Sequence, residues 1–212
     1  ALMVPIVLSW DNTSTKGMAG ANFDSVISWT EAMAKELIAF HDVDPESIFV
    51  GGIAHFDLYY RPDSLMDRDE IFEHLGLDPN RKLLIFATKT PSNYPWNPDL
   101  VRLLAKAIKD DRFVSPCQVL VRLHPNHFRT EETGEFRHNA LLEEYKTIEK
   151  ENEFVHFNIP QIRSKVLSAD MPYSEMVDVG SMLKYAEVLV NIFSTMSLEA
   201  CIFDLPVVNV GF

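Results

Sequence analysis

The chain contains little glycine, with eight glycines among 212 residues. Nothing in it matches GxGxxG or GxxxxGK[ST], the patterns in which glycines let a backbone approach a phosphate closely. The GxSxG pattern of a nucleophilic serine on a strained turn is absent too. The sequence therefore gives no support to a dinucleotide fingerprint, a P-loop or a hydrolase of that kind.

Basic residues are also scarce, because 19 Lys and Arg stand against 31 Asp and Glu, for a net charge of −12. A protein that binds nucleic acid must neutralise several phosphates with a basic face. The composition therefore argues against a nucleic-acid partner. Any anionic ligand has to be held by a local group of donors.

Cysteine and long apolar runs are equally limited. The two cysteines, Cys117 and Cys201, have no paired spacing and lie in or beside apolar segments, so we predict buried free thiols in a reducing compartment. No apolar run approaches the length of a membrane span, and no basic region followed by an apolar stretch opens the chain. The composition, 47% hydrophobic and 24% charged, is typical of a globular protein. We expect a cytoplasmic location.

Short apolar runs alternate with helix-compatible segments along most of the chain. Runs of this kind predict parallel strands buried on both faces by helices. The predicted strands are 6–9, 25–28, 47–50, 83–87, 118–123, 154–157, 188–192 and 206–210. The predicted helices are 30–40, 98–109, 139–150, 198–203 and one that begins at about residue 178 and leads into the strand at 188–192. In the first of these helices, Thr30 is the expected N-cap, and Met33, Leu37 and Phe40 share one face.

The predicted fold class is α/β with two Rossmann-like domains, the first of them incomplete. Residues 1–60 form the end of the first domain, 61–81 a linker, and 82–212 a second domain that binds a nucleotide. The linker prediction rests on a stretch near residues 57–69 that is rich in Pro, Asp and Tyr and has no periodicity. The chain opens and closes on strand patterns without covering elements, so we expect a fragment of a longer protein.

Three polar loops follow predicted strands of the second domain, at 88–90, 124–126 and 194–195. Ligands of parallel sheets bind outside the carboxyl ends of the strands. A helix that begins at such a loop offers free N–H groups to a phosphate, and Ser194, Thr195 and Ser197 could add hydroxyl donors. Glu199, one turn further on, could accept from sugar hydroxyls. The alternative is that Ser194 is simply an N-cap.

His124 closes a predicted strand and Pro125 fixes the chain direction after it, which places the imidazole at the sheet edge. There it could bind a phosphate and help a nucleotide to leave, although it could equally bond a backbone carbonyl. His127 forms an HxxH pair with His124, but no further ligands complete a metal set. We therefore expect no metal and no cofactor.

Three charged residues are weaker candidates. Lys89 could reach the same ligand as a point charge, or could be a solvated surface lysine. Arg122 lies within a strand expected to be buried, so it is either paired or directed at the cleft. Asp11 lies in a polar loop that would face the second domain, and is a candidate for acceptor contact and for the catalytic base; it could also only stabilise a turn.

Several phrases together resemble a known family. The HP pair of RLHP at 122–125, the Ser-Thr pair with Glu199 five residues beyond Ser194, and the closing EACIFDLPVVNVGF look like the second domain of GT-B-fold transferases. VISWTEAMAKEL and IFVGGIAHFDLYY are similar to the end of the first domain in these proteins. The nearest groups are the bacterial surface-polysaccharide enzymes: CDP-glycerol glycerophosphotransferases, capsule enzymes and sialyltransferase-like proteins. The non-hydrolysing UDP-GlcNAc 2-epimerases share the fold.

The resemblance implies a function for the matching residues. His124, Ser194 and Thr195 would bind the nucleotide phosphates, and Glu199 would bind the ribose. The implied enzyme transfers a glycosyl or glycerophosphate-like group from a nucleotide-activated donor to a saccharide or lipid-linked acceptor, in surface-polysaccharide biosynthesis. Peripheral membrane association could come from missing parts of the chain, and the fragment alone is expected to be inactive. The alternatives are an epimerase of the same fold and a non-catalytic nucleotide- or partner-binding module.

Overall fold

The structure is a computed structural model that describes residues 1–15, 23–163 and 171–211. The chain divides into two compact units, 1–57 and 58–212. No helix among the described residues is long and apolar enough to cross a membrane.

The first unit is a small α/β layer. Its two-stranded parallel sheet pairs β1 (Val26–Ser28) with β2 (Ile48–Val50), and α1 (Glu31–His41) connects them. The Thr30 side chain caps α1 by accepting from the Met33 N–H, as predicted. Met33 and Leu37 are buried, but Phe40 is 67% exposed. Phe40 thus has the helical spacing of Met33 and Leu37 but, near the end of α1, not their burial.

The strand predicted at residues 6–9 is reduced to an isolated bridge between Ile6 and Ile27. Pro5 has no N–H to extend the pairing. On the other side, the Ser9 N–H already bonds the Asn12 side chain and the Ser9 carbonyl accepts from the Asn12 N–H. A turn thus begins where the strand was expected to continue. Residues 16–22 of the predicted polar loop lie outside the described residues.

The second unit is built on a five-stranded parallel sheet in the order β5-β4-β3-β6-β7. All five strands coincide with predicted apolar runs, to within a residue or two at each end. The strands are β3 (Lys82–Ala87), β4 (Cys117–Arg122), β5 (Val155–Asn158), β6 (Val188–Asn191) and β7 (Val207–Asn209). Parallel strands are expected to be apolar on both sides, because helices cover both faces.

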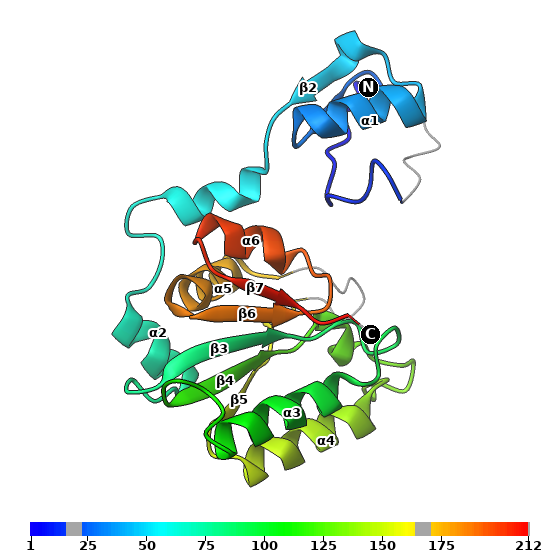
Figure 1. Ribbon diagram of the computed structural model, residues 1–212. Coiled ribbons are helices and arrows are strands. Elements are labelled where there is room, and N and C mark those ends of the chain that lie inside the picture. Colours follow the sequence, from blue (N-terminus) through cyan, green and yellow to red (C-terminus); the bar gives the residue numbers. More distant parts are fainter. Residues whose placement is uncertain (16–22, 164–170, 212) are drawn as a thin grey trace. The chain divides into compact units, whose positions relative to one another are not determined.

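Two helical layers enclose this sheet (Figure 1). One face of β3, with Leu84 and Phe86, packs in a core shared with α3 (Asn97–Lys109) and α4 (Asn139–Glu151). The other face, with Leu83 and Ile85, packs in a second core. That core is shared with α2 (Arg68–Leu75), α5 (Tyr173–Tyr185) and α6 (Met196–Ile202). The predicted α/β class with parallel sheets covered by helices is confirmed.

The segment predicted as a linker, 61–81, contains helix α2. Ile71 and Phe72 of this helix are buried in the second core. Asp67 caps the helix in a capping box with Glu70, and Gly76 ends it with φ 66°. The apolar pattern of residues 61–81 is too short to show a helical period in the sequence. In the structure, the two adjacent apolar residues Ile71 and Phe72 anchor this segment to the sheet.

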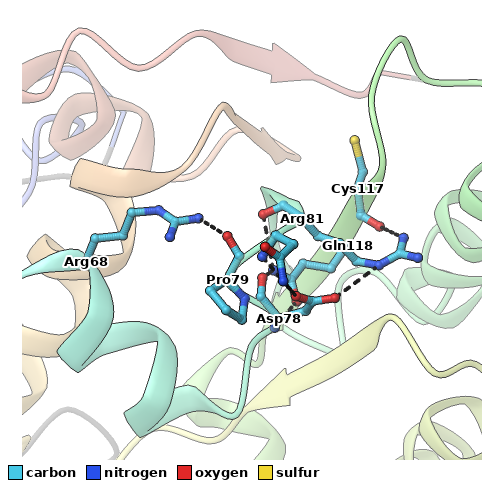
Figure 2. Close-up of polar contacts among 7 residues, drawn as sticks. Arg68, Asp78, Pro79, Arg81, Cys117 and Gln118 are labelled. Carbon is cyan, nitrogen blue, oxygen red and sulfur yellow. Dashed lines mark hydrogen bonds and ion pairs between the residues drawn. The ribbon is translucent and has the colours of Figure 1, made fainter.

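The amino edge of the sheet is closed by a polar network (Figure 2). The buried Gln118 side chain accepts from the Asp78 N–H at 2.9 Å and donates to the Asp78 carbonyl at 2.8 Å. Arg81 donates to the Cys117 carbonyl at 3.0 Å, and Arg68 of α2 bonds a carbonyl of the same turn. This network fixes the turn that enters β3.

Both cysteines are free, as predicted, but their burial differs. Cys117 is buried, and burial raises the pKa of its thiol. Cys201 is exposed, which contradicts the prediction that both are buried. The preceding residue, Ala200, occupies the core-facing position of α6 and leaves Cys201 outside.

Candidate functional site

The order of the strands marks the place where a ligand crevice is expected, and we call the loops after β3, β4 and β6 the crevice. The chain runs outward from β3 to β4 and β5, then returns to place β6 on the other side of β3. The loops after β3 and β6 therefore lead to helices in opposite layers, α3 and α6. In open parallel sheets, ligands bind at the carboxyl ends of strands where the order reverses in this way. Lys89 and Ser194 lie in these two loops.

A buried asparagine shapes the turn between β6 and α6. Asn191 is fully buried, its Oδ1 accepts from the Ser194 N–H at 3.2 Å, and its Nδ2 donates to Ser197 Oγ at 2.9 Å. Phe193, which directly precedes Ser194, adopts a positive φ of 45°, which is uncommon for a residue other than glycine. Asn191 thereby holds the two serines of the predicted hydroxyl cluster in one turn.

The expected free N–H groups at the start of α6 are not available. The N–H of Met196 bonds Ser194 Oγ at 3.2 Å, and the N–H groups of Ser197 and Leu198 bond carbonyls of the same turn. Ser194 thus serves as a local cap, the alternative considered from the sequence, while Thr195 at the N-cap position makes no side-chain cap bond. Any anion at this turn has to be bound mainly by side chains.

Lys89 connects the two loops of the crevice. Its Nζ donates to the Phe193 carbonyl at 2.8 Å. The buried Asn97 at the start of α3 holds the Lys89 backbone: its Oδ1 accepts from the Lys89 N–H, and its Nδ2 donates to the Lys89 carbonyl, both at 3.0 Å. An ammonium group has three donors, so Lys89 can bind an anion while it keeps its contact with Phe193.

His124 lies at the end of β4, as predicted, and is tied to the loop after β3. Its backbone N–H donates to Thr88 Oγ1 at 2.9 Å, and its Nε2 lies 3.5 Å from Thr90 Oγ1. Its Nδ1 accepts from the Asn126 N–H at 3.1 Å. Burial, with smaller contributions from Lys89 and Arg129, lowers the pKa of His124 to about 4. The imidazole is therefore neutral near pH 7 and carries its proton on Nε2.

His127 has a different environment. It is fully buried, its Nδ1 lies 2.9 Å from the His124 carbonyl, and its Nε2 lies 3.3 Å from the Tyr145 hydroxyl. Burial lowers its pKa to about 4 as well. Both of its nitrogens thus contact the protein. Within the described ranges, no group of three or more His, Cys, Asp and Glu side chains could hold a metal ion.

The polarity of these hydrogen bonds indicates which ligand the crevice accepts. Ser194 Oγ and Ser197 Oγ each accept a bond from the protein, so each hydroxyl keeps its proton available. His124 likewise accepts through Nδ1 and keeps an N–H at Nε2. Together with the ammonium of Lys89, the crevice offers donors and a positive charge. This arrangement favours an anion with several acceptor oxygens.

Two predicted binding residues make protein contacts instead. The guanidinium of Arg122, 6% exposed, bonds Asn158 and forms an ion pair with the buried Glu175 of α5. Arg122 is therefore paired, one of the two possibilities that the sequence left open. The carboxylate of Glu199 accepts from the Tyr59 hydroxyl at 2.5 Å, and burial raises its pKa. Binding of a ribose by Glu199 would have to compete with Tyr59.

Asp11 belongs to the first unit. Its carboxylate accepts from Ser9 Oγ at 2.5 Å, and its carbonyl accepts from the Thr15 N–H at 3.0 Å. These bonds stabilise a turn, as the alternative interpretation expected. Its catalytic role remains a prediction.

Asn97 and Asn191 position the loops of the crevice, but neither was predicted from the sequence. Asn191 interrupts the apolar run at 188–192, and a polar residue inside a buried strand is a usable signal. Asn97 gives no such signal, because it stands in a loop-like stretch between Trp96 and Pro98.

Comparison with known proteins gives results for structure only. No protein-family model matches the sequence, and no curated protein matches it significantly. The chain is similar to UDP-GlcNAc 2-epimerase from Neisseria meningitidis, solved with UDP-GlcNAc. The TM-score is 0.61 and the identity 11%, over 88% of this chain and 44% of that one. It is also similar to S. aureus MnaA solved with UDP, with a TM-score of 0.57 and 15% identity over 89% and 42% of the two chains.

A third similar structure is that of the wall teichoic acid polymerase TagF, in a variant soaked with CDPG. Its TM-score is 0.52 and its identity 20%, over 87% of this chain and 37% of that one. The chain thus spans less than half the length of these proteins. At these identities the likeness establishes the fold, and the GT-B-like fold predicted from the sequence is confirmed.

Proposed function

We propose that the second unit binds the diphosphate of a nucleotide-activated donor at the carboxyl ends of β3, β4 and β6. The intact protein would transfer a glycosyl or glycerophosphate-like group from this donor to a saccharide or lipid-linked acceptor, in cytoplasmic steps of surface-polysaccharide assembly. One observation carries the proposal: the side chains of Lys89, His124, Ser194 and Ser197 all keep donors available at the edge where the strand order reverses.

The same donors suit the chemistry of transfer. Negative charge grows on the phosphate oxygen as its bond to the transferred group breaks, and donors held in place beforehand stabilise that charge. In the proposal, Lys89 supplies a fixed positive charge and His124 a hydrogen bond from Nε2. A bound diphosphate favours the imidazolium form of His124, and this charged ring can transfer its Nε2 proton to the leaving oxygen as a general acid and return to the neutral form. Asp11 of the first unit is the proposed group for contact with the acceptor.

A binding experiment tests the first step. Titration calorimetry of the chain with UDP, CDP and inorganic pyrophosphate should give lower affinity for Lys89→Ala and for the pair Ser194→Ala/Ser197→Ala. Each lost charge-assisted hydrogen bond should weaken binding by about 1.5–3 kcal/mol. Lys150→Ala is the matched control, because Lys150 is an exposed lysine of α4. Equal affinity in all variants would contradict the proposed site.

An epimerase of the same fold is the second candidate, since the structure of the UDP-GlcNAc 2-epimerase has a TM-score of 0.61. The two activities differ in their need for an acceptor. The intact protein should be incubated with UDP-GlcNAc or CDP-glycerol, with and without acceptor, and followed by NMR. Nucleotide release that depends on the acceptor supports the transferase, and a new sugar epimer without acceptor supports the epimerase. Binding without either reaction would favour a non-catalytic module.

A further inference from the structure

A pocket of about 520 Å³ opens in the loop between β3 and α3. Its lining residues are Tyr94, Trp96, Asp99 and Leu100. The rings of Tyr94 and Trp96 meet edge to face, with centroids 5.4 Å apart and planes at 80°. Trp96 is nevertheless 59% exposed. A large aromatic ring fixed by a neighbour but open on one side is suited to stacking with a flat ligand.

The pocket is attached to the anion-binding loop through Asn97. The Nδ2 of Asn97 donates to the Tyr94 carbonyl at 2.6 Å, and the same side chain bonds both backbone groups of Lys89. The buried amide thus holds Lys89 and the aromatic pair in one fixed loop. A ligand with its phosphates at Lys89 therefore has this pocket within the same structural unit.

The chemistry of the lining selects among the parts of a nucleotide-activated donor. The pocket includes one carboxylate, Asp99, which repels phosphate and accepts N–H groups. Arg102 lies 3.4 Å from this carboxylate but makes a shorter ion pair of 2.7 Å with Glu144. The remaining lining is mostly carbon, which gives few partners for the many hydroxyls of a sugar. A nucleobase has two apolar faces and a few polar edge atoms, and it fits this lining better.

We propose that this pocket binds the nucleobase of the donor, stacked on Trp96, with Asp99 accepting from an amino group at the edge of the base. The inference rests on the proposed diphosphate site and goes beyond it by naming the residues that recognise the base. A carboxylate accepts from the amino group of cytosine and repels the carbonyl oxygen that uracil carries at the same position. CDP should therefore bind more tightly than UDP.

The test compares ligands with and without a base. Titration calorimetry measures the binding of CDP, UDP and inorganic pyrophosphate to the wild type and to Trp96→Ala, Trp96→Phe and Tyr60→Ala. Loss of base stacking should lower the affinity of Trp96→Ala for CDP by about 5- to 150-fold. Its affinity for pyrophosphate should not change, and Trp96→Phe should recover most of the loss. Tyr60→Ala removes a ring that is also exposed, at 70%, and should leave all affinities unchanged.

Several outcomes would overturn the inference. Unchanged CDP affinity in Trp96→Ala would show that the pocket serves another ligand. An equal loss for CDP and pyrophosphate would show that Trp96 supports the loop instead of contacting the base. In both cases the diphosphate proposal survives if Lys89→Ala weakens both ligands, whereas a wild type that binds neither ligand removes both proposals. Asp99→Asn should shift the preference from CDP toward UDP, and an unchanged ratio would contradict the role of Asp99.

Discussion

The protonation of His124 should be linked to ligand binding. Burial lowers its pKa to about 4 in the free protein, so the ring is neutral near pH 7. A bound diphosphate adds negative charge next to Nε2 and favours the imidazolium, which raises the pKa. The complex then holds more protons than the free protein, so nucleotide affinity should rise as the pH falls through the bound-state pKa toward about 4. NMR titration of the ring with and without CDP checks this, and a pKa that does not change on binding would exclude contact.

In the intact protein, His124→Ala should lower the rate of transfer by roughly 10²–10⁴-fold if the ring acts as a general acid. His127→Gln should have little effect on the rate, because both ring nitrogens of His127 contact the protein. Steady-state kinetics measures both variants. Full activity in both would remove the proposed acid and favour the non-catalytic module.

His127 should instead affect stability. Its pKa of about 4 in the folded protein lies below the ordinary histidine value of 6.5, so the unfolded state binds the proton first as the pH falls. The stability that depends on neutral His127 is complete above pH 6.5 and is lost between pH 6.5 and about 4. At about 1.4 kcal/mol per pKa unit, the loss is on the order of 3 kcal/mol. Urea unfolding at several pH values should show a smaller loss of unfolding free energy in His127→Gln than in the wild type. His138→Gln is the control, because this ring is less buried, and its loss of unfolding free energy should be close to that of the wild type.

For individual residues, the loops of the crevice could be predicted from the sequence, but the partner that each side chain contacts could not. His124, Lys89 and Ser194 were identifiable because polar residues directly follow apolar runs, and strand ends share an edge. Arg122 and Glu199 could not be assigned, since their partners Glu175 and Tyr59 are remote in sequence. A long-range pairing of this kind depends on how helices pack on the sheet, which a local pattern does not contain.

Among the elements, α5 contains a glycine whose replacement should destabilise the protein. In a helix interior, Gly→Ala normally stabilises by about 1 kcal/mol. At Gly180, an added Cβ would lie 2.7 Å from the Tyr59 ring and 2.8 Å from a methyl group of Leu65. We therefore expect Gly180→Ala to lower the free energy of unfolding by about 1–3 kcal/mol, as overpacking does.

Urea denaturation measures this change, and a double-mutant cycle isolates its cause. In a Tyr59→Ala background the ring is absent, so Gly180→Ala should cost less than in the wild type. An equal cost in both backgrounds would show that Tyr59 is not the obstacle.

The longer helices and strands were largely predictable, because each is long enough to show the hydrophobic pattern of its type. Six-residue runs such as β3 and β4 are apolar on both sides, and amphipathic α3 and α4 show a helical repeat. Short elements were less predictable. Helix α2 has eight residues and gave no visible period, and the exposed positions of Phe40 and Cys201 depend on which neighbours happen to cover each face.

In the whole molecule, the fold favours the binding of an anion at one edge of the sheet, whereas the net charge opposes it. The GT-B-like sheet collects the donors of a few loops at one edge, while the chain as a whole carries a charge of −12. The binding of an anion therefore depends on short-range contacts in a molecule whose long-range field repels it.

This contrast predicts an unusual dependence of the association rate on salt. The Debye length falls from about 30 Å at 0.01 M to about 10 Å at 0.1 M salt, which screens distant charges and leaves contacts in the crevice largely intact. The association rate constant for CDP should therefore rise over this range, whereas a protein with a basic site would show a decrease. Stopped-flow fluorescence measures the rate. Lys150→Glu makes the net charge more negative away from the crevice, so it should slow association at low salt and enlarge the increase with salt. A rate that falls as salt is added would show that the field of Lys89 and its neighbours dominates the approach of the ligand.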